Sequence, residues 1–144
     1  MMEPGQENSF ENCVEKIEAS YEFMLAYAAQ GRDKEPSGGG SGPSVRQFAS
    51  QLQDAVQHIA GAGKKQITAL ELPAKTKVAL HSLALQLEQD AERAKKVIDV
   101  VLSAPALSSQ LIDNLNASAH LRCLLTTIFV LDEVLQQHAR AAAV

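Results

Sequence analysis

Residues 121–135 read LRCLLTTIFVLDEVL, the most apolar stretch of the chain. Between Cys123 and Leu131 no side chain is charged, and only two threonines interrupt the apolar residues. A surface helix of a soluble domain has one apolar stripe, whereas a helix that is apolar nearly all round is buried among its neighbours. The stretch therefore predicts a central helix that other helices cover on nearly every side.

The composition favours a single helical domain. A chain of 144 residues is long enough to bury a core of its own. Hydrophobic residues make up 46% of it, which excludes wholesale disorder, and Leu and Ala outweigh the 4% of aromatic residues, which favours helices over strands. The net charge of −4 excludes the strongly basic class of dedicated nucleic-acid binders.

Charge and composition divide the chain into three segments. Residues 1–35 hold eight acids against three bases, whereas the remainder holds nine acids and ten bases. We interpret 1–35 as an acidic N-terminal segment with an amphipathic helix and 36–43 as a Gly/Ser-rich linker, either natural or engineered. Residues 44–144 are then the helical core of the same bundle.

The first expected helix has two distinct stripes. Its apolar residues recur at spacings of four and three, which places them on one face: Phe10, Val14, Ile17, Tyr21 and Met24. A second stripe is acidic: Glu7, Glu11, Glu15, Glu18 and Glu22. Like charges at this spacing repel each other in an isolated helix, so the acidic stripe is either solvated or faces a basic partner.

The remaining periodic segments complete an all-α, antiparallel four-helix bundle. Ser44 and Gln47 form a capping-box pattern that begins the second helix, and Gly61-Ala-Gly63 is expected to end it, leaving 64–72 as a connection. Weak helix formers near Asn116 predict a kink or break in the last helix. Short connections favour antiparallel neighbours. The expected helices are 9–30, 44–61, 73–103 and 108–142.

No pattern of catalytic or ligand-binding residues emerges. The four histidines lack the local spacing of metal ligands, and no Gly-rich phosphate loop follows a strand. Cys123, set among leucines, is interpreted as inert core filling. We therefore expect no catalytic residue, no metal and no cofactor, and a protein that is not an enzyme.

The sequence also predicts a location. It opens with no signal peptide pattern, and its uncharged runs are shorter than the roughly 20 residues that span a bilayer. Two cysteines in apolar patterns fit a reducing compartment. We expect a cytoplasmic or nuclear protein.

Apolar helical surface without catalytic residues predicts a protein–protein interaction module, a scaffold or adaptor subunit. The first helix is either integral to the bundle or a tethered segment docked in its groove. A small helical carrier of lipids or apolar ligands, with a cavity beside Ile128 and Phe129, is the alternative. A protein partner is expected through an amphipathic helix, with no nucleic acid and no membrane contact, and homo- or hetero-oligomers are both open. The expected partner-binding residues are Phe10, Val14, Ile17, Tyr21, Met24, Lys64 and Lys65.

Overall fold

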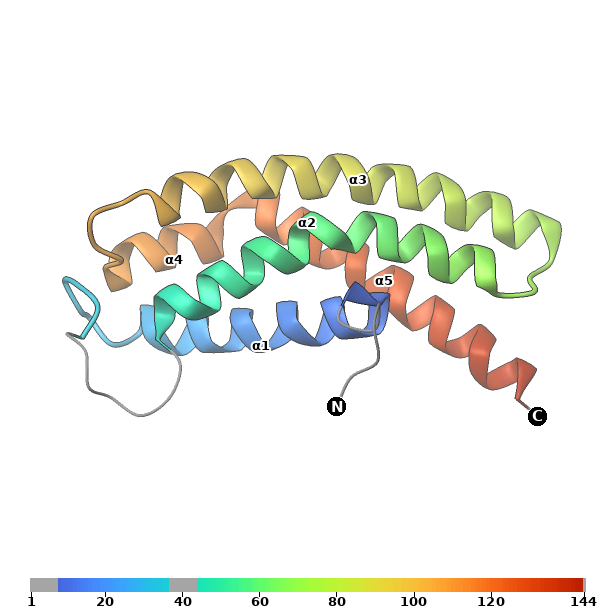
Figure 1. Cartoon of the computed structure of the whole chain (residues 1–144), viewed down its shortest axis with the longest axis horizontal. Coiled ribbons are helices and arrows are strands. Elements are labelled where there is room, and N and C mark those ends of the chain that lie inside the picture. The colour runs from blue at the N-terminus through green and yellow to red at the C-terminus, as the bar shows by residue number, and fades with distance from the viewer. Residues whose placement is uncertain (1–7, 37–43, 144) are drawn as a thin grey trace.

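The computed structural model describes residues 8–36 and 44–143, and these residues form helices without any strand. The all-α prediction is therefore confirmed. Five helices follow one another in the described part of the chain (Figure 1). They are α1 (Phe10–Ala28), α2 (Val45–Ala69), α3 (Ala74–Leu102), α4 (Ser109–Ala117) and α5 (Ala119–Ala142). The linker predicted at 36–43 lies, apart from Pro36, outside the described residues.

The expected fourth helix is two helices, so the bundle has one more element than predicted. The chain leaves the helical conformation at Ser118, whose ψ of 127° separates α4 from α5. The amide of Ser118 donates to the carbonyl of Leu115, and its own carbonyl accepts from Arg122 at the start of α5. The break predicted near Asn116 thus lies two residues later, in a stretch where the low helix propensity of Asn and Ser favours an interruption.

The second helix continues well beyond its expected end. We expected Gly61-Ala-Gly63 to terminate it, but α2 runs through both glycines to Ala69. Its apolar face continues with the buried Ala62 and Ile67, and burial of that face outweighs the low helix propensity of glycine. Residues 64–69, predicted as part of a connection, are helical.

Side-chain caps begin three of the helices as their sequences indicate. The Ser9 hydroxyl accepts from the amide of Asn12 at α1, and Ser44 and Gln47 complete the capping box at α2. Ser108 caps α4 by accepting from the amide of Leu111. After α1, Gly31 has a φ of +66°, a conformation that glycine adopts without strain.

The helices pack in sequence around one apolar core. In Figure 1, α1, α2 and α3 form successive neighbours, with α4 and α5 behind them. The main contacts pair α1 with α2, α2 with α3, α3 with α5 and α1 with α4, whereas α1 scarcely touches α5. That weak contact leaves a hollow between α1 and the second half of α5, which is described below.

Candidate functional site

The α1 residues predicted to bind a partner lie in the core. Phe10, Val14, Ile17 and Met24 are at most 4% exposed, and Tyr21 is half-buried against the same cluster. They lie on the helix that packs along α2 and α4. The structure therefore brings these five residues together inside the bundle, where a partner reaches them only if α1 leaves.

Buried hydrogen bonds fasten the end of α1 to α4 and the segment before it. The Tyr27 hydroxyl donates to the carbonyl of Leu107 over 2.5 Å, and the Ser109 hydroxyl donates to the carbonyl of Tyr27 over 2.8 Å. Asn116 of α4 donates its side-chain amide to the carbonyl of Met24 over 3.1 Å. Burial raises the pKa of Tyr27, so the phenol remains a neutral donor.

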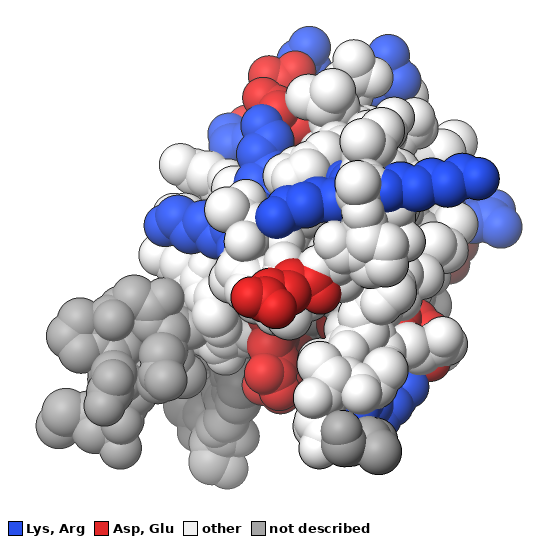
Figure 2. Space-filling view, turned by 90° about the vertical axis from the view of Figure 1, so that its right-hand side faces the viewer, with Lys and Arg blue, Asp and Glu red and all other residues white. Residues whose placement is uncertain are grey.

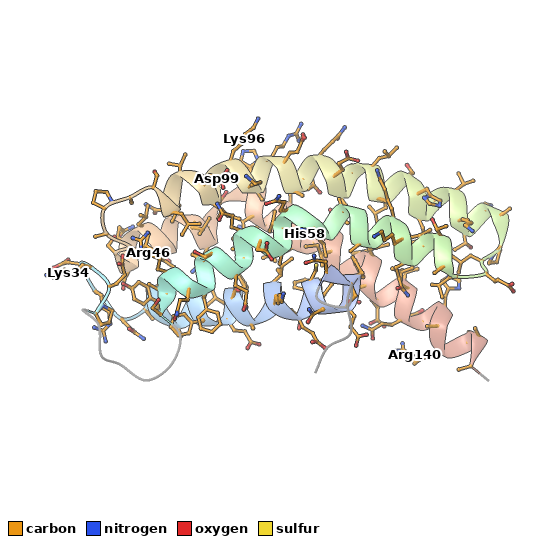
Figure 3. All side chains as sticks on the ribbon, viewed as in Figure 1. Lys34, Arg46, His58, Lys96, Asp99 and Arg140 are labelled. Carbon is orange, nitrogen blue, oxygen red and sulfur yellow. The ribbon has the colours of Figure 1, made fainter. Side chains whose placement is uncertain are left out.

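An ion pair fastens the segment that follows α1. Glu35 accepts hydrogen bonds from Arg46, with 3.0 Å between Nη2 and Oε1, and from the amide of Leu107. Arg46 also donates to the carbonyls of Leu102 and Ala104. In Figure 3, Arg46 lies where α2 begins, with Lys34 beyond it on the segment after α1. The hydrogen bond from Arg46 is the main cause that lowers the pKa of Glu35.

Lys64 and Lys65 lie at the end of the molecule where α2 passes into α3. Figure 2 shows that end, with basic side chains across its upper half and acidic ones between and below them. Lys64 pairs with Glu88 of α3 over 2.9 Å, whereas Lys65 is exposed. The two predicted binding residues are therefore neighbours in sequence, but one of them already has an acidic partner.

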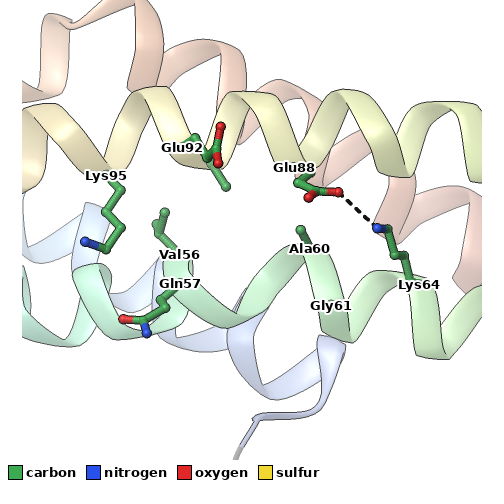
Figure 4. Close-up of a pocket in the computed structure, with 9 residues that line it drawn as sticks. Val56, Gln57, Ala60, Gly61, Lys64, Glu88, Glu92 and Lys95 are labelled. Atoms are coloured by element: carbon green, nitrogen blue, oxygen red, sulfur yellow. Dashed lines mark hydrogen bonds and ion pairs between the residues drawn. The ribbon is translucent and has the colours of Figure 1, made fainter.

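A shallow groove of about 320 Å³ runs between α2 and α3 beside that ion pair (Figure 4). Small residues line its floor, including Ala60, Gly61 and Ala91. Its rim carries charges of both signs, from the Lys64–Glu88 pair to Glu92 and Lys95. Lys95 is itself paired with Asp99, which is four residues further along α3. The rim charges thus neutralise one another largely within the molecule.

The outward face of α5 contradicts the prediction that this helix is buried on nearly every side. The exposed side chains in the middle of α5 include Cys123, Thr126, Phe129 and Val130. The buried side chains of the helix are Leu121, Leu124, Leu125, Thr127, Ile128, Leu131 and Leu135. Phe129 is 39% exposed and Val130 is 51% exposed. Cys123 is an exposed free thiol and not the core filling that we expected. Only α3 packs extensively on α5, so one seam of α5 is covered and the opposite face is not.

A hollow of about 340 Å³ separates α5 from the start of α1. Its apolar lining includes Phe10 and Leu135, and its acidic lining includes Glu11 of α1 and Asp132 of α5. Further along α1, the pKa of Glu18 is raised by partial burial and then by nearby acids, of which Asp132 is the strongest. We call this hollow, together with the row of exposed acids that continues from Glu11 along α1, the acidic furrow; the row is Glu11, Glu15, Glu18 and Glu22.

The other flank of α5 carries a polar hollow of about 430 Å³ beside α3. Asp90 is only 4% exposed there and accepts a hydrogen bond of 2.7 Å from the Thr127 hydroxyl. Arg122 and Cys123 line the same hollow. The Asp90–Thr127 bond fixes the register of α3 against α5, because a buried carboxylate without a donor is costly. The alternative hypothesis of an apolar-ligand carrier places a cavity beside Ile128 and Phe129. Neither residue lines the α2–α3 groove, the hollow beside α1 or the polar hollow.

Within residues 8–36 and 44–143, no three side chains of His, Cys, Asp or Glu gather closely enough to hold a metal ion. His58 lies against its own helix, with Nδ1 2.8 Å from the carbonyl of Asp54. None of the helices that the structure describes combines the length and the apolar character of a bilayer span.

Comparisons of the chain with protein-family models, with curated proteins and with solved structures found no match. A function must therefore be inferred from the molecular surface itself. On that surface, the uncovered face of α5 lies between the acidic furrow and the polar hollow.

Proposed function

We propose that this chain is a non-enzymatic protein–protein interaction module, a scaffold or adaptor subunit, whose partner docks a helix on the outward face of α5. The exposure of Phe129 and Val130 carries the proposal. They are adjacent and lie near the C-terminal end of the nine residues, Cys123 to Leu131, that contain no charge. Neighbouring exposed apolar residues on a regular helix suit a partner helix, which covers them by adding a further seam.

The packing of α1 supports a bundle in which this helix is integral rather than docked. Its buried apolar side chains are Phe10, Cys13, Val14, Ile17, Met24 and Tyr27. At about 1.5–3 kcal/mol for each large apolar side chain, their exposure costs on the order of 10 kcal/mol. That is comparable to the whole unfolding free energy of a small domain. Docking on the face of α5 requires no such rearrangement and is therefore less costly in free energy than displacement of α1.

The test uses substitutions that place a charge on an exposed apolar position. We expect Val130→Asp to abolish capture of the partner from the cells that produce the protein, because a carboxylate is costly to bury in an apolar contact. The matched control is Val78→Asp on α3, since Val78 is 71% exposed and lies on another helix. A photo-crosslinking residue at position 129 identifies the partner by mass spectrometry. Equal capture by both Asp variants would contradict docking on α5.

A further inference from the structure

From the acidic furrow and its exposed apolar border, we infer that the partner is a basic amphipathic helix, whose apolar face covers Phe129 and whose basic flank lies against the carboxylates of α1 and α5. This inference rests on the proposed function and specifies the chemistry of the partner. It combines three observations: the shape of the furrow, the apolar residues that border it and the sign of its charges.

The furrow and the exposed apolar face adjoin one another on α5. Phe129 precedes Asp132 by three residues and Gln136 by seven, so the three share one face of the helix. Asp132 and Gln136 line the hollow against α1, and Phe129 is therefore the next side chain along its wall.

On α1, a row of exposed side chains continues from Glu11, which lines the hollow. Glu11, Glu15, Glu18 and Glu22 follow one another at helical spacing, and Leu25 continues the row three residues later. All four glutamates are exposed, and Leu25 is 47% exposed. Each helix thus contributes an acid to the hollow, Glu11 or Asp132, and carries an exposed apolar side chain further along, Leu25 or Phe129. From Glu11 to Leu25 the furrow suits a helix of about four turns, roughly 21 Å at 1.5 Å per residue.

Acids outnumber bases among the residues of the furrow, with Glu11, Glu15, Glu18, Glu22 and Asp132 against Arg140. Every charged neighbour that shifts the pKa of Glu18 is an acid: Asp132, Glu22 and Glu15. On α5, Arg140 lines the end of the furrow but lies 3.6 Å from Glu133. Arg122, seven residues before Phe129, lines the polar hollow beside α3.

An excess of like charges at this spacing costs folding free energy and is relieved by a cationic ligand. The α2–α3 groove differs in this respect, because its Lys64–Glu88 and Lys95–Asp99 pairs already neutralise one another. A basic helix is therefore drawn to the furrow and not to that groove.

The test compares two synthetic peptides of about four turns that share one leucine face, the first with lysine and arginine on its flanks and the second with glutamate. Binding to the full chain is measured by fluorescence anisotropy. We expect the basic peptide alone to bind, with an affinity that falls as salt increases. The triple variant Glu18→Gln, Glu22→Gln, Asp132→Asn should weaken it at least about five-fold, given the usual energies of rim ion pairs.

A second triple variant removes the same charges elsewhere: Glu71→Gln, Glu92→Gln and Asp113→Asn, all three at exposed positions. It should bind the basic peptide as the unmodified chain does. If both triple variants weaken binding equally, or if the acidic peptide binds as tightly as the basic one, the inferred partner chemistry is wrong.

Phe129→Ala separates this failure from failure of the proposed function. We expect it to weaken the basic peptide several-fold, with Val78→Ala as the control. If the acidic peptide binds and Phe129→Ala weakens that binding, the partner is not basic, but helix docking on α5 still stands. If Phe129→Ala leaves peptide binding unchanged, both the basic partner and helix docking on α5 are contradicted.

Discussion

Glu35 is a charged residue that connects three parts of the bundle. Its carboxylate accepts from Arg46 and from the amide of Leu107, and so connects the segment after α1 with the start of α2 and the α3–α4 connection. Because the hydrogen bond from Arg46 lowers its pKa, the folded state binds a proton at Glu35 less readily than the unfolded state. Its stabilisation is therefore present above the ordinary pKa of about 4.5 and is lost as the pH falls through the lowered value.

The variant Glu35→Gln tests this contribution, because it keeps the shape of the side chain and removes the charge. We expect it to lower the unfolding free energy by about 0.5–1 kcal/mol at pH 7, the usual range for a partly exposed ion pair. The difference from the unmodified chain should shrink as the pH falls below about 4.5 and vanish below the lowered pKa. Urea titrations across this range measure it, with Asp113→Asn as the control, and a difference independent of pH would contradict the assignment.

At the scale of single elements, periodicity predicted which segments are helical and less reliably where they end. The apolar spacing and the caps at Ser9 and Ser44 correspond to helices in the structure. The prediction that Gly61-Ala-Gly63 ends the second helix was wrong, because helix propensity is a local property. It contains no information on the packing of Gly63 near Leu87, Leu131 and Phe10, which belong to three other helices.

The outward face of α5 shows the same limit for the candidate site. The absence of charge between Cys123 and Leu131 does not by itself mean burial. Five of its buried residues recur at spacings of three and four, a single-seam pattern that Leu125 widens and that leaves the other face free: Leu121, Leu124, Ile128, Leu131 and Leu135. That pattern was available in the sequence. The acidic furrow was not, since no local period pairs Glu18 with Asp132 across more than a hundred residues.

The continuation of α2 through its glycines makes a prediction about that element. A methyl group added at Gly61 would meet no atom within 4 Å, so Gly61→Ala removes the flexibility of glycine without a clash. We expect it to raise the unfolding free energy by about 1 kcal/mol, as in other helix interiors. Gly31→Ala is the contrasting control, since its φ of +66° should make it destabilising by about 1 kcal/mol. Thermal unfolding of both variants measures the pair, and destabilisation by Gly61→Ala would show that the helix does not continue there.

For the molecule as a whole, the question is whether α1 is an integral helix of the bundle or a tethered segment that can detach from it. The burial of α1 against α2 and α4, the bonds at its end and the Glu35–Arg46 pair all act within the folded bundle and need no covalent linker. A tethered, exchanging segment would instead depend on the high effective concentration that the linker provides. Cutting the chain between residues 36 and 44 separates these two cases.

We expect a chain with a protease site introduced between residues 36 and 44 to remain one particle after cleavage. The order of 10 kcal/mol of apolar burial on α1 is large enough to offset much of the association cost at micromolar concentration. Size-exclusion chromatography should show the two pieces eluting together, and hydrogen exchange should protect 10–28 as strongly as 121–135. The same cleavage in an Ile17→Asp, Met24→Asp variant should release the first piece, because both side chains are fully buried. Release of α1 from the cleaved, otherwise unmodified chain would mean that α1 is a detachable segment. The groove between α2 and α4 would then be a second docking site.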